Sequence, residues 1–406
     1  MRIGTTTVTV SVLVCLHAGA AAAQVQTLTL PAVLARAREQ APAIISARLA
    51  ADEVRARLVG ASLRLQSNPD VEALVGNRAA AETRFTDFEI GVGQSFEPRG
   101  RRTARIAAAN AAIVQSAANV DEATRSVLRG AASAYFRAVH ATERIRLLAA
   151  TQDLAQNVYS IAERRFRAGD IAVLDVNIAR AATARIKAER EGAEATKALA
   201  LGDLRQLLRL DGDLAVDASL TRSAPPDLSS ALQAASQRPE LRALEAALQE
   251  AEAELRVGLT FSKPEYGLGL KYAREEGDHI LRGGLTVTLP LFSTGQEQRA
   301  LGSARAARLR AELDAARARV QSEVRAAFEA YTRRLAAVTV LDSEAIPGLD
   351  ENERLTTRSF EVGQIGLVEL LLIRHEILDT RSDHLNALLE AALARVDLDA
   401  AAGVLR

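Results

Sequence analysis

The chain has little of what builds an enzyme site or a disulfide scaffold. Tryptophan is absent, aromatic residues make up 3% of the sequence, and the single cysteine, Cys15, lies in an apolar segment near the N-terminus. Disulfides and thiol chemistry are therefore excluded for the rest of the chain. A globular core of this size normally contains more aromatic side chains, so their scarcity favours alanine- and leucine-rich helices packed closely in bundles.

The charges are balanced, and nothing in them indicates a polyanionic partner. The sequence has 51 basic and 51 acidic residues, so we expect no nucleic-acid partner. The sequence has no phosphate-binding loop or nucleophile motif. The histidines beyond the N-terminal segment are scattered: His140, His279, His375 and His384. We therefore expect no enzyme, no cofactor and no metal site.

Residues 1–23 are predicted to be a cleaved export signal. Arg2 gives the positive start, residues 8–18 form the apolar centre, and three alanines precede the predicted cleavage site. The apolar run is shorter than the ~20 residues needed to span a bilayer. Val14 stands before Cys15, where a lipoprotein signal requires a small residue, so we expect no lipid attachment.

Landmarks in the first half of the chain return in the second half at a nearly constant spacing. The segment around Gly169 returns around Gly363, a shift of 194 residues. Three further pairs recur at shifts of 194 to 197: Arg180 with Arg374, 96–100 with 291–295, and Pro42 with Pro239. Such a shift indicates two copies of one long unit, because short repeats have periods of roughly 20–50 residues. We predict a first repeat over 24–210, a linker over 211–237 and a second repeat over 238–406.

Each repeat contains a pair of segments in which apolar residues alternate with small or polar ones, at about 69–96 and about 264–291. This alternation is typical of strands in a transmembrane β-barrel, and the alternative is a pair of soluble hairpins that cap a helical bundle. Two tyrosines stand where an aromatic girdle is expected at the membrane interfaces. The residues predicted to face lipid are Phe88, Ile90, Val92, Tyr266, Leu268, Leu270, Tyr272, Leu285, Val287 and Leu289.

Long helix-forming segments connect these features. A first helix is predicted over 30–65, and a run of 67 residues over 101–167 contains no proline. A helix of that length spans roughly 100 Å, far more than one globular domain. The chain then turns at Gly169 and returns. The second repeat runs over 296–362 with a break predicted at Pro347, turns at its matching glycine and returns.

Four strands in one chain cannot close a barrel, and open sheet edges are not tolerated in lipid. The smallest membrane barrels have about eight strands. Several copies must therefore each contribute two hairpins, while the long helices continue the wall outside the membrane. The predicted fold class is mainly α with a transmembrane β-barrel: a long helical tunnel, four strands per protomer and an internal duplication.

With these features the sequence resembles the outer-membrane efflux proteins, the channel components of tripartite export systems. The resemblance covers essentially all of the mature chain, and its most specific parts are the motifs over 166–175 and 360–369. The strand-to-helix junction at 289–295 adds to them, and the stretch at 100–102 is similar to the heavy-metal branch. The resemblance implies a homotrimer with a twelve-stranded barrel in the outer membrane and a tunnel in the periplasm. It also implies docking on a periplasmic adaptor protein and an inner-membrane pump of the RND type.

The resemblance further implies roles for residues at the two helix-hairpin turns. Asp175 and Glu369 align with acidic positions near the tunnel constriction, where three copies would form a cation-attracting ring. The alternative is that both are ordinary first-turn acids of helices. Phe360 and Ile365 stand where some relatives have a gating tyrosine and arginine, so closure by apolar packing and ion pairs is expected here. The residues expected to contact the adaptor are Arg167, Gly169, Ile171, Val362, Gly363 and Ile365.

The function predicted from these features is a passive exit duct of a tripartite efflux system, most closely one for heavy-metal cations. Efflux of organic compounds and export of a secreted polypeptide are alternatives within the channel class. A periplasmic coiled-coil scaffold without a pore is the alternative outside it.

Overall fold

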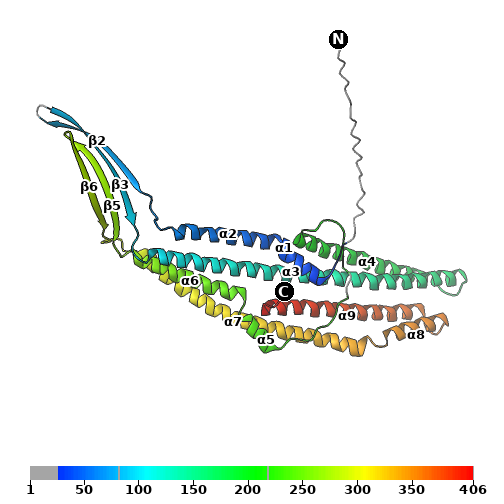
Figure 1. Ribbon diagram of the computed structural model, residues 1–406. Coiled ribbons are helices and arrows are strands. Elements are labelled where there is room, and N and C mark those ends of the chain that lie inside the picture. The colour runs from blue at the N-terminus through cyan, green and yellow to red at the C-terminus, as the bar shows by residue number, and fades with distance from the viewer. Residues whose placement is uncertain (1–25, 81–82, 217–218, 406) are drawn as a thin grey trace, which may run out of the picture.

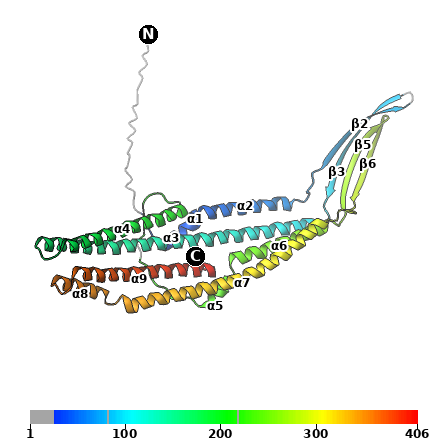
Figure 2. The ribbon, with the colours of Figure 1, turned by 180° about the vertical axis from the view of Figure 1, so that it is seen from behind.

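The computed structural model describes residues 26–80, 83–216 and 219–405. It is an elongated body of helices with a four-stranded sheet projecting from one end (Figure 1). The same arrangement seen from behind places the two helix-hairpin turns together at the opposite end (Figure 2). The mainly α fold class is therefore confirmed. The predicted export signal, residues 1–23 with Cys15, lies outside the described residues.

The body is built around one helix that runs its full length. α3 (Arg101–Arg167) has 67 residues and the predicted bounds. α4 (Val173–Leu208) returns along it. Many of the residues that α3 buries are alanines, and such short side chains let neighbouring helices approach closely. The shortage of aromatic residues in the sequence thus has a direct counterpart in this packing.

The single helix predicted over 30–65 was wrong, because the structure has two helices there. α1 (Leu30–Gln40) ends at Ala41, and α2 (Pro42–Ser62) begins with a proline at its first position. Proline lacks a backbone N–H and its ring disfavours a helical conformation in the residue before it. Ala41 is accordingly extended, with φ −63° and ψ 126°.

The second repeat has the same elements with one additional break. α6 (Pro239–Thr260) precedes the second strand pair, and α7 (Gln296–Val340) follows it. α7 ends in a π-helical turn, η1 (Leu341–Ala345), before Pro347, so the predicted break is confirmed. α8 (Leu349–Glu361) and α9 (Leu367–Ala402) then form the second hairpin.

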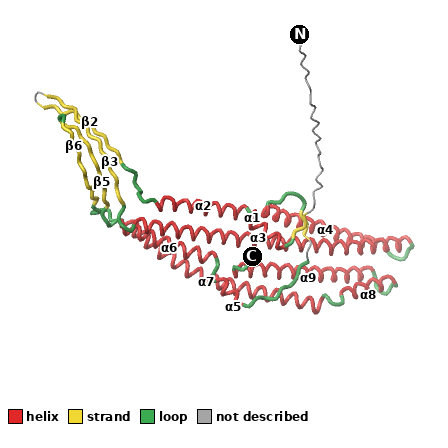
Figure 3. The backbone as a smooth tube through the Cα atoms, viewed as in Figure 1, coloured by secondary structure: helices red, strands yellow, loops and turns green. Residues whose placement is uncertain are grey.

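The segment between the repeats has structure of its own. β4 (Leu214–Val216) pairs in parallel with β1 (Gln26–Leu28) beside the middle of the body (Figure 3). α5 (Leu228–Ala235) follows and begins at Asp227, whose side chain accepts a hydrogen bond from the backbone N–H of Ser230. The linker therefore contacts β1 and helices of both repeats.

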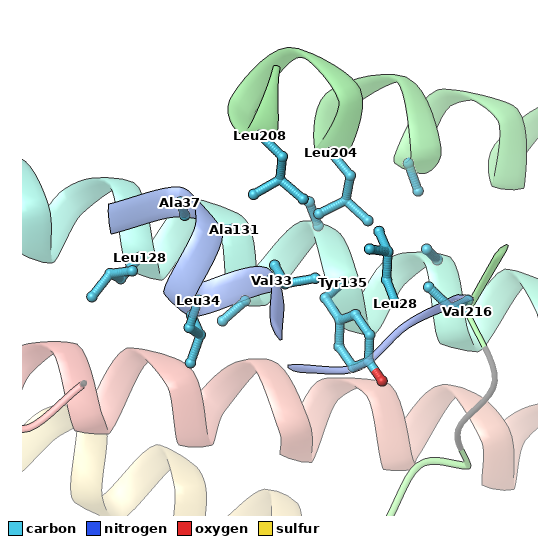
Figure 4. Packing of buried hydrophobic residues seen from close by; sticks show 14 of the residues in the cluster. Leu28, Val33, Leu34, Ala37, Leu128, Ala131, Tyr135, Leu204, Leu208 and Val216 are labelled. Carbon is cyan, nitrogen blue, oxygen red and sulfur yellow. The ribbon is translucent and has the colours of Figure 1, made fainter. Parts of the chain in front are cut away.

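The core of the first repeat lies where these elements meet. α1, β1, α3, α4 and β4 contribute to one cluster (Figure 4). Leu128, Leu204 and Leu208 are almost fully buried in it. Truncation of a leucine in such a place to alanine typically costs about 2–5 kcal/mol.

The sheet has the strand order β2-β3-β5-β6 and is antiparallel throughout. Its strands are β2 (Asp70–Ala80), β3 (Thr83–Phe96), β5 (Glu265–Glu275) and β6 (Asp278–Thr288). The central pair β3–β5 joins the two repeats in one sheet. Among the described residues no strand pairs with the outer edge of β2 or of β6, so the sheet ends in two free edges.

Candidate functional site

The predicted lipid-facing residues of the strands share one face of the sheet. The register pairs Ile90 with Tyr272, Leu268 with Leu285, and Tyr266 with Val287. Successive side chains alternate between faces, so pairing in this register keeps the whole apolar set together. These side chains are exposed, Leu268 by 58%. We call this surface the apolar face; it comprises Val71, Val75, Phe88, Ile90, Val92, Tyr266, Leu268, Leu270, Tyr272, Leu285 and Val287. Leu289 lies one residue beyond the end of β6 and is also exposed.

The opposite face carries charges and glycines. Lys271 bridges Glu72 and Glu89 with Nζ–Oε distances of 2.9 Å to each. Arg282 pairs with Glu275 on the same face. At Gly91 a Cβ atom would come within 2.9 Å of the Lys271 side chain, so the absent side chain makes room for the lysine stem. A sheet with these two faces, closed on itself, has an apolar exterior and a polar interior.

The two hairpin turns at the far end of the body have the same backbone geometry. Gly169 has φ +84° and Gly363 has φ +78°, a region that favours glycine. The next residue in each turn donates a hydrogen bond to a carbonyl five residues back, Asp170 to Arg165 at 2.9 Å and Gln364 to Ser359 at 2.8 Å. This is the Schellman termination of a helix.

The side chains predicted at these turns divide into exposed and half-buried ones. Arg167 and Val362 are exposed beside their glycines. Ile171 and Ile365 are half-buried and pack against one cluster that joins both hairpins. The two turns therefore form one surface, because the buried cluster next to them joins both hairpins.

The two predicted aperture acids have different surroundings. An Asp175 carboxylate oxygen accepts a hydrogen bond from the Ala172 N–H at 3.3 Å, so this side chain caps the start of α4. Glu369 holds the matching position in the first turn of α9, is exposed, and has no hydrogen-bond or ion-pair partner within the described part of the chain. Of the two acids, only Glu369 therefore has a carboxylate without a hydrogen bond in the described part of the chain.

Phe360 lies inside the protomer and not on its surface. Its ring is 4% exposed and packs among Val158, Val176 and Leu370 from three other helices. The Arg165 guanidinium lies 5.4 Å from the ring centroid, within cation–π range. Phe360 therefore packs helices of both hairpins together.

Two arginines that were paired in the sequence but given no role make polar links between helices here. Arg374 donates to the Leu154 carbonyl at 3.1 Å and to the Thr357 hydroxyl at 3.0 Å. Arg180 donates to the Tyr159 hydroxyl at 3.2 Å. Burial lowers the pKa of Arg374 from its ordinary value, and nearby Glu353 partly opposes this. The shift of 194 residues between the repeats could have indicated these links. It relates Arg180 to Arg374, and it relates Tyr159, which bonds to Arg180, to Glu353, which lies near Arg374.

A groove of about 420 Å³ lies between the two hairpins near these links. Ile178 and Leu372 contribute apolar walls, while Arg185 and His375 contribute a polar edge. Among the described residues there is no group of three or more His, Cys, Asp or Glu side chains that could hold a metal ion. In the same ranges, none of the helices combines the length and apolar character needed to cross a membrane.

Comparison with known proteins assigns the chain to a family. A sequence profile described as "Outer membrane efflux protein" matches residues 33–208 and 231–404. The chain belongs to the outer membrane efflux protein family. The resemblance drawn from its sequence is thereby confirmed, and the protein is an outer-membrane efflux channel component.

Individual relatives of this outer membrane efflux protein share less than a third of its residues. It is 27% identical to the cobalt-zinc-cadmium resistance protein CzcC of Cupriavidus metallidurans, over 83% of this chain and 81% of CzcC. It is 28% identical to protein CyaE of Bordetella pertussis, over 75% and 68% of the two chains. The crystal structure of the Campylobacter jejuni CmeC outer membrane channel matches 92% of the chain and 85% of CmeC, with a TM-score of 0.77 and 18% identity. That likeness shows a shared fold.

Proposed function

We propose that this chain assembles as a homotrimer into a passive exit duct for heavy-metal cations. The observation that carries the proposal is the four-stranded sheet, which has one apolar face, two free edges and a direct connection to a 67-residue helix. Three copies joined edge to edge give twelve strands, enough to close a barrel and satisfy every edge. The helices then continue its wall over roughly 100 Å.

Similarity to a cobalt-zinc-cadmium resistance protein supports heavy-metal cations as the cargo. A duct of this kind needs no tight metal site, because strong binding would slow the release of the ion. The exposed carboxylate of Glu369 suits a weaker role: in three copies it forms a ring that attracts cations. Asp175 holds the matching position and contributes less, since its carboxylate already caps α4.

The hairpin turns are the proposed docking surface for a periplasmic adaptor protein, which would connect the duct to an inner-membrane pump of the RND type. Arg167 and Val362 are exposed there. Gly169 and Gly363 fix the turn geometry, and Ile171 and Ile365 support it from the cluster beneath. The sheet at the opposite end would lie in the outer membrane, with the apolar face toward lipid.

The experiment that tests the cargo is growth of a deletion strain on graded zinc, cadmium, cobalt, nickel and copper, with hydrophobic drugs in parallel. We expect the deletion strain to be selectively sensitive to metals, and we expect the plasmid-borne gene to restore its tolerance. Sensitivity to drugs alone would move the protein to export of organic compounds. Purified protein that forms no pore in planar bilayers would contradict the duct itself and favour a scaffold.

A further inference from the structure

The four connections between strands and helices gather at one end of the sheet. We call them the junction; it comprises residues 63–69, 97–100, 261–264 and 289–295. Lys263 donates from Nζ to the Arg99 carbonyl at 3.0 Å, which joins two of these connections. Gly295 lies against Phe261, where an added Cβ would come within 2.8 Å of the phenylalanine side chain, and this contact joins a third.

The fourth connection is fixed to the same place by arginines. Arg102 donates to the Ser62 carbonyl at 2.9 Å, and Arg105 donates to the Leu63 carbonyl at 3.4 Å. Both carbonyls belong to the C-terminal end of α2, where unpaired oxygens attract positive charge. The junction is therefore one continuous surface and not four separate loops.

Positive charge in the junction exceeds negative charge. Its one acid, Glu97, is paired with Arg105, and Glu265 next to it at the start of β5 is paired with Arg101. Three further bases, Arg64, Arg99 and Lys263, are exposed and pair with no carboxylate of the described chain. The β5–β6 turn at the other end of the sheet differs in sign, since residues 275–278 contain three acids and no base.

The junction also carries the most exposed apolar side chains next to the sheet. Leu289 is 61% exposed, Leu291 73% and Phe292 91%. Leu289 continues the alternation of Leu285 and Val287 one residue beyond β6, and Leu291 and Phe292 follow it in the connection to α7. Apolar and aromatic side chains beside clustered bases are the combination found where a protein meets the headgroup layer of a membrane.

We propose that the junction binds the headgroups of anionic phospholipids in the membrane leaflet nearer the helical body. Arg64, Arg99 and Lys263 contact the phosphates, while Leu291 and Phe292 enter the acyl layer above them. This inference rests on the proposed insertion of the sheet. Copies joined through the outer edges of β2 and β6 would bring three junctions into one ring, so a neighbouring copy adds bases of the same sign.

The absence of tryptophan allows a direct test. Phe292→Trp places a single fluorescent reporter at the most exposed large apolar side chain of the junction. The full-length protein is reconstituted in phosphatidylcholine vesicles that contain a minor fraction of either brominated phosphatidylglycerol or brominated phosphatidylcholine. Stronger quenching by the brominated phosphatidylglycerol is expected, because anionic lipid accumulates around the bases.

Variants then assign that preference to the bases. Arg64→Gln, Arg99→Gln and Lys263→Gln, combined with the reporter, should remove it, with the relative affinity falling about fivefold for each base lost. The matched control changes three exposed bases far along the helical body, Lys187→Gln, Arg325→Gln and Arg333→Gln, and should keep the preference.

Three results would overturn the inference. Equal quenching by the two lipids means contact without recognition of the headgroup. Lack of quenching by either lipid means that position 292 packs against another copy of the chain. Suppression of the preference by the control variant means that overall charge, and not the junction, attracts the lipid. Single-channel conductance in the same lipids separates the two proposals, since a protein without conductance refutes the duct, whereas conductance with equal quenching refutes only the lipid site.

Discussion

Arg374 on α9 donates a hydrogen bond from Nη1 to the backbone carbonyl of Leu154 on α3, at 3.1 Å. The two residues belong to different repeats and are 220 positions apart. The other terminal nitrogen of Arg374 bonds to Thr357 on α8. One guanidinium therefore joins three helices and both hairpins, close to the end that carries the turns.

Arg374→Gln is expected to loosen the two hairpins from each other. The shorter amide cannot reach both partners, so the free energy of unfolding should fall by about 1 kcal/mol for each hydrogen bond broken. The conductance of the purified channel in planar bilayers should rise. Arg354→Gln is the matched control, because within the described ranges Arg354 forms an ion pair only with Glu351, on the surface of the same hairpin. Equal conductance of both variants and the wild type would show that Arg374 does not hold the channel closed.

Gly363→Pro should abolish export while sparing insertion in the membrane. Proline cannot adopt φ +78° and removes the N–H that bonds to the Phe360 carbonyl at 3.2 Å. Gly363→Ala should have a weaker effect, since a left-handed conformation costs a non-glycine residue about 1 kcal/mol. Gly366→Ala, three residues on at φ −80°, is the control and should behave as wild type. Export is measured as metal tolerance, and insertion as protein in the outer-membrane fraction. Loss of Gly363→Pro from that fraction would contradict this prediction.

Glu369→Gln should reduce the cation preference of the channel at a stability cost of only about 0.3 kcal/mol, because the exposed carboxylate stands in the first turn of α9. The carboxylate lies exposed and has no partner in the described part of the chain, so its removal breaks no contact. The reversal potential under a salt gradient measures the preference, and thermal unfolding measures the stability. Asp175→Asn should instead cost about 0.5 kcal/mol by weakening the charge at the start of α4. Unchanged selectivity in Glu369→Gln would rule out a ring at that position.

Acidification should destabilise the helical body through His140. Burial lowers the pKa of this histidine, and Arg144 acts in the same direction, against a hydrogen bond with Asn386. The unfolded chain therefore binds the proton at a higher pH than the folded chain does. The stability is fully present above the ordinary histidine pKa of about 6.5 and falls as the pH drops toward the lowered value. His140→Gln should flatten the pH dependence of the unfolding temperature, and an unchanged slope would refute this assignment.

The parts of the fold that follow from local pattern were accessible in the sequence. The uninterrupted run over 101–167 predicted α3 at its observed bounds, and the period-two alternation located all four strands of the sheet. The break at Ala41 was missed, since the apolar spacing continues through it and only Pro42 marks the end of a helix. The pairing of β1 with β4 joins segments of three residues, which are too short to carry a pattern.

The site was less accessible because its contacts cross between repeats. The shift of 194 residues related Arg180 to Arg374, yet their partners differ: one bonds to a tyrosine hydroxyl and the other to a helix carbonyl. Phe360 was expected at the aperture and lies buried, because helix α8 turns its ring toward α3 and α4. Which face of a helix points inward depends on neighbours that a single repeat does not contain.

Because α3 is unbroken, it sets the length of the helical body. Its 67 residues determine the distance between the sheet and the turns, whereas the second repeat covers that distance with a helix, a π turn and another helix. Inserting one residue in α3 would rotate everything beyond it by about 100° and turn its alanine stripe away from its neighbours. The reach of this protein can therefore change only in steps of whole helical turns, made at matching heights in every helix alongside.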